Sequence, residues 1–262
     1  MSKKLPKSVV VYEGPSRLDG APIVAIVTGL RRPSNNPKTG RMAQLWIVRS
    51  DMSPLEAIDR RADYSICGDC KLRGNGAQDR ACYVMVKNAP LAVYRAFKRG
   101  KYPTMDPATV GAYLGASNLP IRFGAYGEPV ALPVYVLNDL ASGGARYTGY
   151  THQWNAPHVA RLYSHLLMAS ADTACEAATA NANGWRTFRT RAADAPMLPG
   201  EIACPASDEM NHRTTCADCA LCDGSRGAND RRRNIAIIVH GSTKVHYAKL
   251  FRRDGANVVA TV

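Results

Sequence analysis

The middle of the chain alternates between strand-like and helix-like segments, and this alternation constrains the fold more than any other feature. Strand-like stretches begin near residues 121, 146, 167, 185 and 201. Helix-like stretches lie between them, at 130–143, 158–166 and 173–184. Parallel strands need such helical crossovers, which are nearly always right-handed. The sequence therefore predicts an α/β fold, a partial (β/α) barrel with parallel strands, rather than a β-sandwich.

Proline, aspartate and glycine residues mark the expected helix ends. Pro157 fits the first turn of the helix that follows it. Asp172 is expected to cap the amino terminus of the next helix, and Gly184 to end that helix. Two further helices are expected upstream, near 86–99 and 107–116.

The size of the chain allows one sizeable core or two modest ones, because 46% of its 262 residues are apolar. We expect a β-rich segment at 1–43, a barrel core at 44–207, and a C-terminal cysteine-knuckle tail with terminal strands at 208–262. The first barrel strand would be QLWIVRS at 44–50. In parallel α/β folds, ligands bind at the carboxyl ends of the strands.

The chain is strongly basic, with a formal net charge of +13 and a pI of about 9.5. Such a charge leaves room for nucleic acid or another anionic substrate as a partner. The basic residues form short, dispersed clusters, however, so a solvated basic surface is the alternative.

The amino-terminal sequence MSKKLPKSVVVYEG has an apolar run too short for a signal peptide. The strand-sized run IAIIV at 235–239 falls far short of the roughly eighteen residues of a membrane helix. The sequence therefore predicts a soluble cytoplasmic protein with no membrane partner. In the cytoplasm disulfides are rare, and closely spaced cysteines usually bind metal.

The C-terminal cysteine group consists of Cys204, Cys216, Cys219 and Cys222, at a C-x11-C-x2-C-x2-C spacing. Structural zinc favours two separated pairs of ligands. Three cysteines that are each two residues apart can instead wrap three corners of an iron–sulfur cubane, with Cys204 as the fourth ligand. We expect a [4Fe–4S] cluster here. Zinc and an unligated thiol cluster are the alternatives.

The N-terminal cysteine group consists of Cys67, Cys70 and Cys82, at a C-x2-C-x11-C spacing. Iron–sulfur and zinc are both open for this group. Three local thiols leave a fourth position, which Cys175, a histidine or a ligand from outside the protein could fill. Cys175 is otherwise expected to be a small, buried helix residue.

The strand-like segment at 121–127 is followed by Glu128 and Pro129. Together with the cysteine loop before it, this segment resembles the radical S-adenosylmethionine superfamily, in which a three-cysteine loop follows the first barrel strand and a Gly-Gly-Glu-Pro motif ends the second. Here Tyr126 replaces the first glycine of that motif, and C-x2-C-x11-C replaces the usual C-x3-C-x2-C. The resemblance covers about 44–207.

This resemblance implies an iron–sulfur enzyme that binds S-adenosylmethionine at an open iron position of a cluster held by the N-terminal cysteine group. The implied cofactor-binding residues are Tyr83 near the adenine, Gly127 and Glu128 at the ligand's ammonium group, and Ser170 at the ribose. The C-terminal cysteine group would hold an auxiliary cluster, and the enzyme would need an electron donor. Its substrate stays open, with nucleic acid or a nucleotide as a candidate, and its catalytic residues are unknown.

Several of these residues have simpler explanations. Glu128 could cap a helix that begins at Pro129. In the segment TGYTHQW, His152 follows a strand end and could contact a substrate, or it could be a satisfied histidine beside a core tryptophan. His240 and His246 could be ligands, although structural roles are commoner.

The chain as a whole is also similar to a tailed-phage cysteine-rich protein family. The shared segments are Cys82-Tyr83, the strand end at 124–129, TGYTHQW at 148–154, CPAS at 204–207 and TTC at 214–216. This similarity implies that the expected cytoplasmic location is the host cytoplasm, if the protein is phage-encoded. It supplies no activity.

A hypothesis from another class is a non-catalytic, zinc-stabilised, nucleic-acid-binding phage protein. Zinc would occupy both cysteine groups, and basic residues would contact phosphate. The sequence contains no G-x-x-x-x-G-K-[ST] loop, H-E-x-x-H helix or G-x-S-x-G elbow, so NTPase, zincin and esterase functions are not supported.

Overall fold

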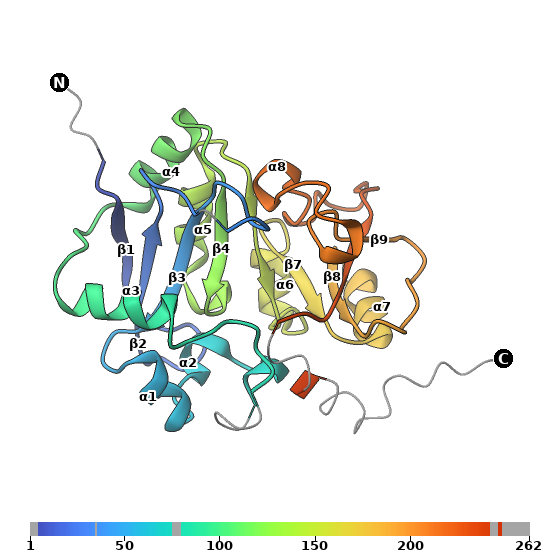
Figure 1. The fold of residues 1–262 in the computed structure, drawn as a ribbon, viewed down its shortest axis with the longest axis horizontal. Coiled ribbons are helices and arrows are strands. Elements are labelled where there is room, and N and C mark those ends of the chain that lie inside the picture. The colour runs from blue at the N-terminus through green and yellow to red at the C-terminus, as the bar shows by residue number, and fades with distance from the viewer. Residues whose placement is uncertain (1–4, 35, 75–79, 242–245, 248–262) are drawn as a thin grey trace.

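The computed structural model describes residues 5–34, 36–74, 80–241 and 246–247. It is a mixed α/β fold in which two sheets lie side by side and helices pack around them (Figure 1). The predicted α/β class with parallel strands is confirmed. The part of the expected tail at 208–262 that follows residue 247 lies outside the described residues.

The first sheet has five strands in the order β1-β2-β3-β4-β5. They are β1 (Ser8–Pro15), β2 (Pro22–Thr28), β3 (Ala43–Arg49), β4 (Ile121–Tyr126) and β5 (Tyr147–Thr148). The strands β1, β2 and β3 pair antiparallel, whereas β3, β4 and β5 pair in parallel across helical connections. The β-rich amino-terminal segment therefore extends the same sheet that begins the parallel region.

The second sheet has the order β6-β7-β8-β10-β9, and its neighbouring strands pair in parallel. They are β6 (Tyr150–Thr151), β7 (Met168–Ala171), β8 (Thr187–Arg191), β10 (Asn234–Ile238) and β9 (Glu201–Ala203). Gly149 alone separates β5 from β6, so one extended segment pairs with β4 on one side and β7 on the other. The parallel strands of the two sheets are therefore neighbours in space.

The strand β10 lies between β8 and β9. A strand near 235 was expected from the sequence, but its place in the sheet was not. The segment after residue 207, expected to be a separate tail, thus contributes a strand to the same sheet as the segments at 168–203.

The α-helices are α1 (Pro54–Asp59), α2 (Tyr64–Cys67), α3 (Ala89–Lys98), α4 (Pro107–Ala116), α5 (Val134–Ala141), α6 (Pro157–Tyr163), α7 (Ala174–Ala182) and α8 (Cys216–Cys219). Short 3₁₀ turns are η1 (Lys71–Arg73), η2 (Pro129–Ala131) and η3 (Asp208–Met210). The helix α4 matches its predicted range, because Asp106 caps it by accepting the Thr109 N–H at 3.0 Å. Pro157 begins α6, as predicted.

Two sequence expectations about α7 are wrong. Thr173, not Asp172, caps the helix, because its hydroxyl accepts the Glu176 N–H at 3.1 Å. Glu176 in turn accepts the backbone N–H of Asp172 at 2.7 Å, an arrangement close to a capping box. Cys175 is exposed rather than buried, because it lies on the solvent side of the first turn.

The main apolar core lies between the first sheet and the helices α4 and α5. Fully buried members include Ile26, Leu45, Phe123, Leu114 and Leu137. A smaller cluster under the second sheet contains Cys204 and Cys222. Among the described residues, no helix is long and apolar enough to cross a membrane.

Candidate metal and cofactor site

One cavity of about 440 Å³ gathers the residues that the sequence singled out. Its wall includes every member of both cysteine groups: Cys67, Cys70, Cys82, Cys204, Cys216, Cys219 and Cys222. It also includes the four residues assigned to cofactor binding: Tyr83, Gly127, Glu128 and Ser170. His240 lines the cavity too, whereas Cys175 and His246 do not. The cavity thus unites residues from distant parts of the chain.

Alternate residues of the neighbouring parallel strands form one wall of the cavity. They are Arg122, Gly124 and Tyr126 from β4, Thr148 from β5, Tyr150 from β6, Phe188 and Thr190 from β8, and Ile235 and Ile237 from β10. Side chains two residues apart in a strand point to the same face. The cavity therefore lies over one face of the contiguous parallel strands.

The N-terminal cysteine group lies at the carboxyl ends of these strands. The helix α2 comes after β3 and ends at Cys67. Glu128, which follows β4, donates its backbone N–H to the carbonyl of the buried Ile66 at 2.6 Å. This bond ties the cysteine-bearing helix to the end of the next parallel strand, where such folds bind ligands.

Gln153 holds the loop between Cys67 and Cys70. In the amide orientation that satisfies both of its atoms, the oxygen accepts the Asp69 N–H at 2.9 Å and the nitrogen donates to the Asp69 carboxylate at 3.3 Å. Gly68 makes this approach possible, because a Cβ at that residue would lie 2.6 Å from the Gln153 amide. The segment TGYTHQW therefore supports the cysteine loop, a role that sequence reasoning missed.

Gly68→Ala is expected to destabilise the fold by about 3 kcal/mol, because Gly68 has a φ of 53° and a ψ of −138°, a region nearly confined to glycine, and because the Gln153 amide would have to move away. Gly100→Ala is the matched control, since Gly100 has a φ of +64° but no atom within 4 Å of the position of a Cβ. That control should cost about 1 kcal/mol. Denaturant unfolding of both variants measures the difference, and equal losses would contradict the proposed contact.

Asp63 links the rest of the cysteine loop to the start of α2. It accepts hydrogen bonds from Arg73 at 2.7 Å and from Arg80 at 3.2 Å. Arg80 is 8% exposed and lines the cavity. Because the two arginines lie on either side of the residues at 75–79, their shared carboxylate holds both arms of the loop against α2.

The Glu128 carboxylate lines the cavity and is 5% exposed. Its Oε2 atom accepts the His152 N–H at 3.1 Å, whereas its buried Oε1 atom has no hydrogen-bond partner among the described residues. Glu128 precedes the turn η2, but its side chain makes no capping hydrogen bond. Because a buried carboxylate oxygen without a donor is costly, this atom is suited to accept a hydrogen bond from a ligand. A helix-capping role is not what the structure shows.

His152 adjoins this carboxylate, with its Nδ1 atom 3.8 Å from the Oε2 atom of Glu128. Burial by itself would lower the pKa of His152, but Cys70 and Glu128 outweigh burial and hold that pKa well above its usual value. The Nε2 atom is buried without a partner among the described residues. Trp154 is buried as expected and donates to the Ser170 carbonyl at 3.0 Å, but His152 is not the satisfied core histidine of the simpler explanation.

Tyr83 lies at the exposed edge of the cavity. Its side chain is among the exposed large apolar ones, at 44%. Its hydroxyl accepts a hydrogen bond from Arg122, and its ring centroid lies 5.9 Å from that of His240. A planar ring at the rim could pack against a flat ligand that enters the cavity.

Gly127 and Ser170 occupy different positions around the cavity. Gly127 has a φ of +87°, and a Cβ there would lie 2.7 Å from Ile47. Its lack of a side chain therefore allows close contact with β3, besides leaving room for a ligand. Ser170 is 8% exposed, on β7. Asp172, two residues after Ser170, does not line the cavity. Burial raises the pKa of its carboxyl to about 6.

In the C-terminal cysteine group, α8 is bound to the loop that leads into β3. Cys216 donates its N–H to the Lys38 carbonyl at 2.9 Å, and Ala217 donates to the Thr39 carbonyl at 3.0 Å. Thr215 caps α8 by accepting the Asp218 N–H at 3.2 Å. The spacing of the cysteines thus forms one capped helical turn that presents Cys216 and Cys219 to the cavity.

Cys204 and Cys222 complete this group from two other segments. Cys204 follows β9 and donates its N–H to the Ala236 carbonyl at 2.8 Å, while the Cys222 carbonyl accepts the Gly149 N–H at 3.0 Å. Burial raises the pKa of Cys204, Cys216 and Cys222. Ligation by a metal would therefore require that these thiols lose their protons on binding.

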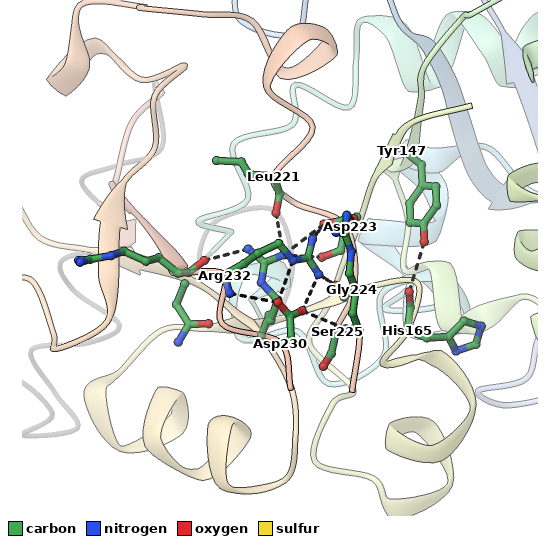
Figure 2. Close-up of polar contacts among 12 residues, drawn as sticks. Tyr147, His165, Leu221, Asp223, Gly224, Ser225, Asp230 and Arg232 are labelled. Atoms are coloured by element: carbon green, nitrogen blue, oxygen red, sulfur yellow. Dashed lines mark hydrogen bonds and ion pairs between the residues drawn. The ribbon is translucent and has the colours of Figure 1, made fainter. Parts of the chain in front are cut away.

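A polar network anchors the loop that follows Cys222 (Figure 2). Arg232 forms ion pairs with Asp223 and Asp230 and donates to the Gly224 carbonyl at 2.8 Å. Its hydrogen bonds lower the pKa of the Asp230 carboxyl. Ser225 donates its N–H to the Ser164 carbonyl at 2.7 Å. The network therefore fixes the segment that carries Cys222 against the end of α6.

Arg186 connects the same loop to the second sheet. Its guanidinium donates to the carbonyls of Leu221 at 2.8 Å, Asp223 at 3.0 Å and Arg233 at 2.8 Å. Arg186 is 4% exposed and directly precedes β8. A buried arginine thus sets the position of Cys222, and the cysteine spacing in the sequence gives no indication of this role.

The two cysteine groups reach the cavity from opposite ends of the parallel strands. The helix α8 contacts residues just before β3 and β5, since Arg146 donates to the Asp218 carbonyl at 2.9 Å. The helix α2 lies at the carboxyl ends, and Figure 1 shows α2 and α8 at opposite ends of the sheet. The two groups therefore line different ends of the same cavity.

All eight cysteines are free. In the part of the chain that the structure describes, no three or more His, Cys, Asp or Glu side chains are arranged so that they could hold a metal ion. No family model, curated protein or solved structure matches the chain.

Proposed function

We propose that the chain is an iron–sulfur enzyme of the radical S-adenosylmethionine type. The observation that carries the proposal is that Cys67, Cys70 and Cys82 share a cavity with Glu128, whose buried Oε1 atom lacks a hydrogen bond among the described residues. Three thiols can hold a cluster with one open iron position, and a nearby carboxylate can bind the ammonium group of an amino-acid ligand. The residue types suit both the cluster and S-adenosylmethionine, although the three thiols are not arranged around a metal position in the structure.

The residues of this chain would bind and orient S-adenosylmethionine. Glu128 would accept a hydrogen bond from the ammonium group, Tyr83 would pack against the adenine at the rim, and Ser170 would bind the ribose. Gln153 and Asp63 would keep the cysteine loop in place. When bound and reduced, the cluster would supply the electron that cleaves S-adenosylmethionine to methionine and an adenosyl radical.

The C-terminal cysteine group would hold a second [4Fe–4S] cluster, with zinc as the alternative. The group supplies thiols from three segments, and all four line the cavity: Cys204, Cys216, Cys219 and Cys222. Its position at the other end of the strands suits an auxiliary centre that faces the same ligand.

The contiguous parallel strands support a partial (β/α) barrel as the scaffold, with the N-terminal cysteine group at its carboxyl end. The proposal retains the similarity to a tailed-phage cysteine-rich protein family. It also retains a location in the host cytoplasm, where an electron donor would reduce the cluster.

Anaerobic reconstitution tests the proposed function. The iron-loaded protein with dithionite should convert S-adenosylmethionine to 5′-deoxyadenosine, and Cys82→Ala should reduce the product to background because the cluster loses a ligand. Cys175→Ala is the matched control, since this cysteine is exposed and outside the cavity. Product is measured by chromatography, with iron, sulfide and zinc assayed in the same samples.

An iron-loaded wild type that does not bind S-adenosylmethionine would contradict the proposal. The zinc-stabilised, nucleic-acid-binding function would then be favoured if zinc is found and binding to nucleic acid weakens steeply with salt.

A further inference from the structure

Two cationic side chains line the cavity without a carboxylate partner among the described residues. The Lys38 Nζ atom lies 2.8 Å from the Nε2 atom of His240. Arg122 donates to the Tyr83 hydroxyl, and its guanidinium lies over the Tyr83 ring, 5.9 Å from the centroid. In both cases the nearest polar partner is neutral or aromatic.

The buried arginines of this chain, by contrast, are paired with acids. Arg49 pairs with Asp51 at 2.7 Å, and Arg189 pairs with Glu201 at 2.7 Å. Arg80, in the same cavity wall, pairs with Asp63 at 3.2 Å. Lys38 and Arg122 are only partly buried. Because even partial withdrawal of a cation from water is costly without a counter-charge, the two unpaired cations are best explained by an anion that binds in the cavity.

Each of the two cations belongs to a segment that contacts the neighbourhood of one cysteine group. Arg122 belongs to the strand wall and contacts Tyr83, the residue after Cys82. Lys38 lies in the loop whose carbonyl accepts the Cys216 N–H. An anion that contacts both cations would therefore lie in the cavity that both cysteine groups line.

We propose that the substrate carries an oxyanion, a carboxylate or a phosphate, that Lys38 and Arg122 bind in the cavity that both cysteine groups line. That the bound molecule is a substrate rests on the proposed function, whereas the anion site itself does not. A guanidinium can bind both oxygens of either group, and the ammonium of Lys38 adds a second charge-assisted hydrogen bond. Tyr83 would then orient the guanidinium toward the anion.

The competing explanation is that the cations neutralise thiolates of the C-terminal cysteine group. It predicts that their removal releases metal and leaves anion binding unchanged. The proposal predicts the reverse, so metal content and anion affinity separate the two.

Inorganic phosphate and acetate are the two probes, titrated into the metal-loaded protein without S-adenosylmethionine. Line broadening of ³¹P follows phosphate, and ¹H saturation transfer follows acetate. The double variant Lys38→Met, Arg122→Leu should weaken binding of the preferred probe at least about tenfold, because two charge-assisted hydrogen bonds are lost. Whichever probe binds more tightly identifies the substrate's anionic group as phosphate or carboxylate.

The control variant Lys98→Met, Arg60→Leu removes the same charges from side chains outside the cavity and should bind the probes as the wild type does. The variant Lys38→Arg, Arg122→Lys keeps both charges and should stay within about threefold of the wild type. If the double variant does not fold, Lys38→Met gives the same comparison, since Lys38 lies in a loop. Undetectable binding of both probes, equal affinity in the cavity and control variants, or loss of metal with unchanged anion binding would overturn the proposal.

The proposed function and the anion site fail in different ways. Absence of 5′-deoxyadenosine in the cleavage assay would contradict the roles proposed for the N-terminal cysteine group and Glu128. Absence of probe binding would contradict only the anion site at Lys38 and Arg122, because that titration contains no S-adenosylmethionine.

Discussion

Cys216→Ala is expected to remove the metal of the C-terminal cysteine group and to lower the melting temperature by about 10 °C. Binding energy at such a site is folding energy, and the loss of one ligand of four removes a large share of it. For a chain of this size, 10 °C corresponds to about 3 kcal/mol. Elemental analysis of anaerobically purified protein gives the metal, and calorimetry gives the melting temperature.

Cys216 separates the ligand role from packing better than Cys222 does. Cys222 is 8% exposed and lies in an apolar cluster, so its truncation would leave a cavity whatever it binds. Cys216 is only partly buried and is the first residue of α8, where alanine is a better helix former. Cys175→Ala, also in the first turn of a helix, is the control and should change neither quantity. Full metal content in Cys216→Ala would show that this thiol is not a ligand.

Local patterns in the sequence predicted the parallel strands and the helices well. The helix α4 has its capping aspartate and first-turn proline in sequence, so its range follows from local chemistry. The insertion of β10 between β8 and β9 depends on pairing between segments distant in the chain, which no local pattern records. The error at Asp172 has the same origin, since the tertiary fold buries that carboxyl and leaves the adjacent Thr173 to cap the helix.

Cysteine spacing identified the thiols that line the cavity but not the residues that hold the cysteine loops in place. Four cysteines in so short a segment have few explanations other than metal binding, so their spacing identified these thiols as candidate ligands. Gln153 and Arg186 act on backbone atoms of loops far away in sequence, so nothing near them signals their roles. Arg122 did carry a signal, since a basic residue within an apolar strand needs a polar partner. Lys38 carried none, because lysine is ordinary in a loop.

Glu128→Gln is expected to weaken the binding of S-adenosylmethionine to the iron-loaded protein by about 10- to 100-fold. The amide has nearly the same shape and can still accept the His152 N–H, which the carboxylate accepts at 3.1 Å. What it loses is the negative charge that faces the ligand's ammonium group, and charge-assisted hydrogen bonds contribute about 1.5 to 3 kcal/mol. Titration calorimetry on samples of equal iron content measures the affinity.

The matched control for this prediction is Glu56→Gln. Glu56 lies on α1, outside the cavity, and its one ion pair among the described residues is with the exposed Arg60 at 2.9 Å, so its neutralisation should leave the affinity unchanged. Iron content should be the same in both variants, because Glu128 is not expected to bind iron. If Glu128→Gln binds S-adenosylmethionine as tightly as the wild type does, the buried Oε1 atom does not bind the ammonium group. If it loses iron instead, Glu128 is a ligand of the cluster, and the site has no open position for the cofactor.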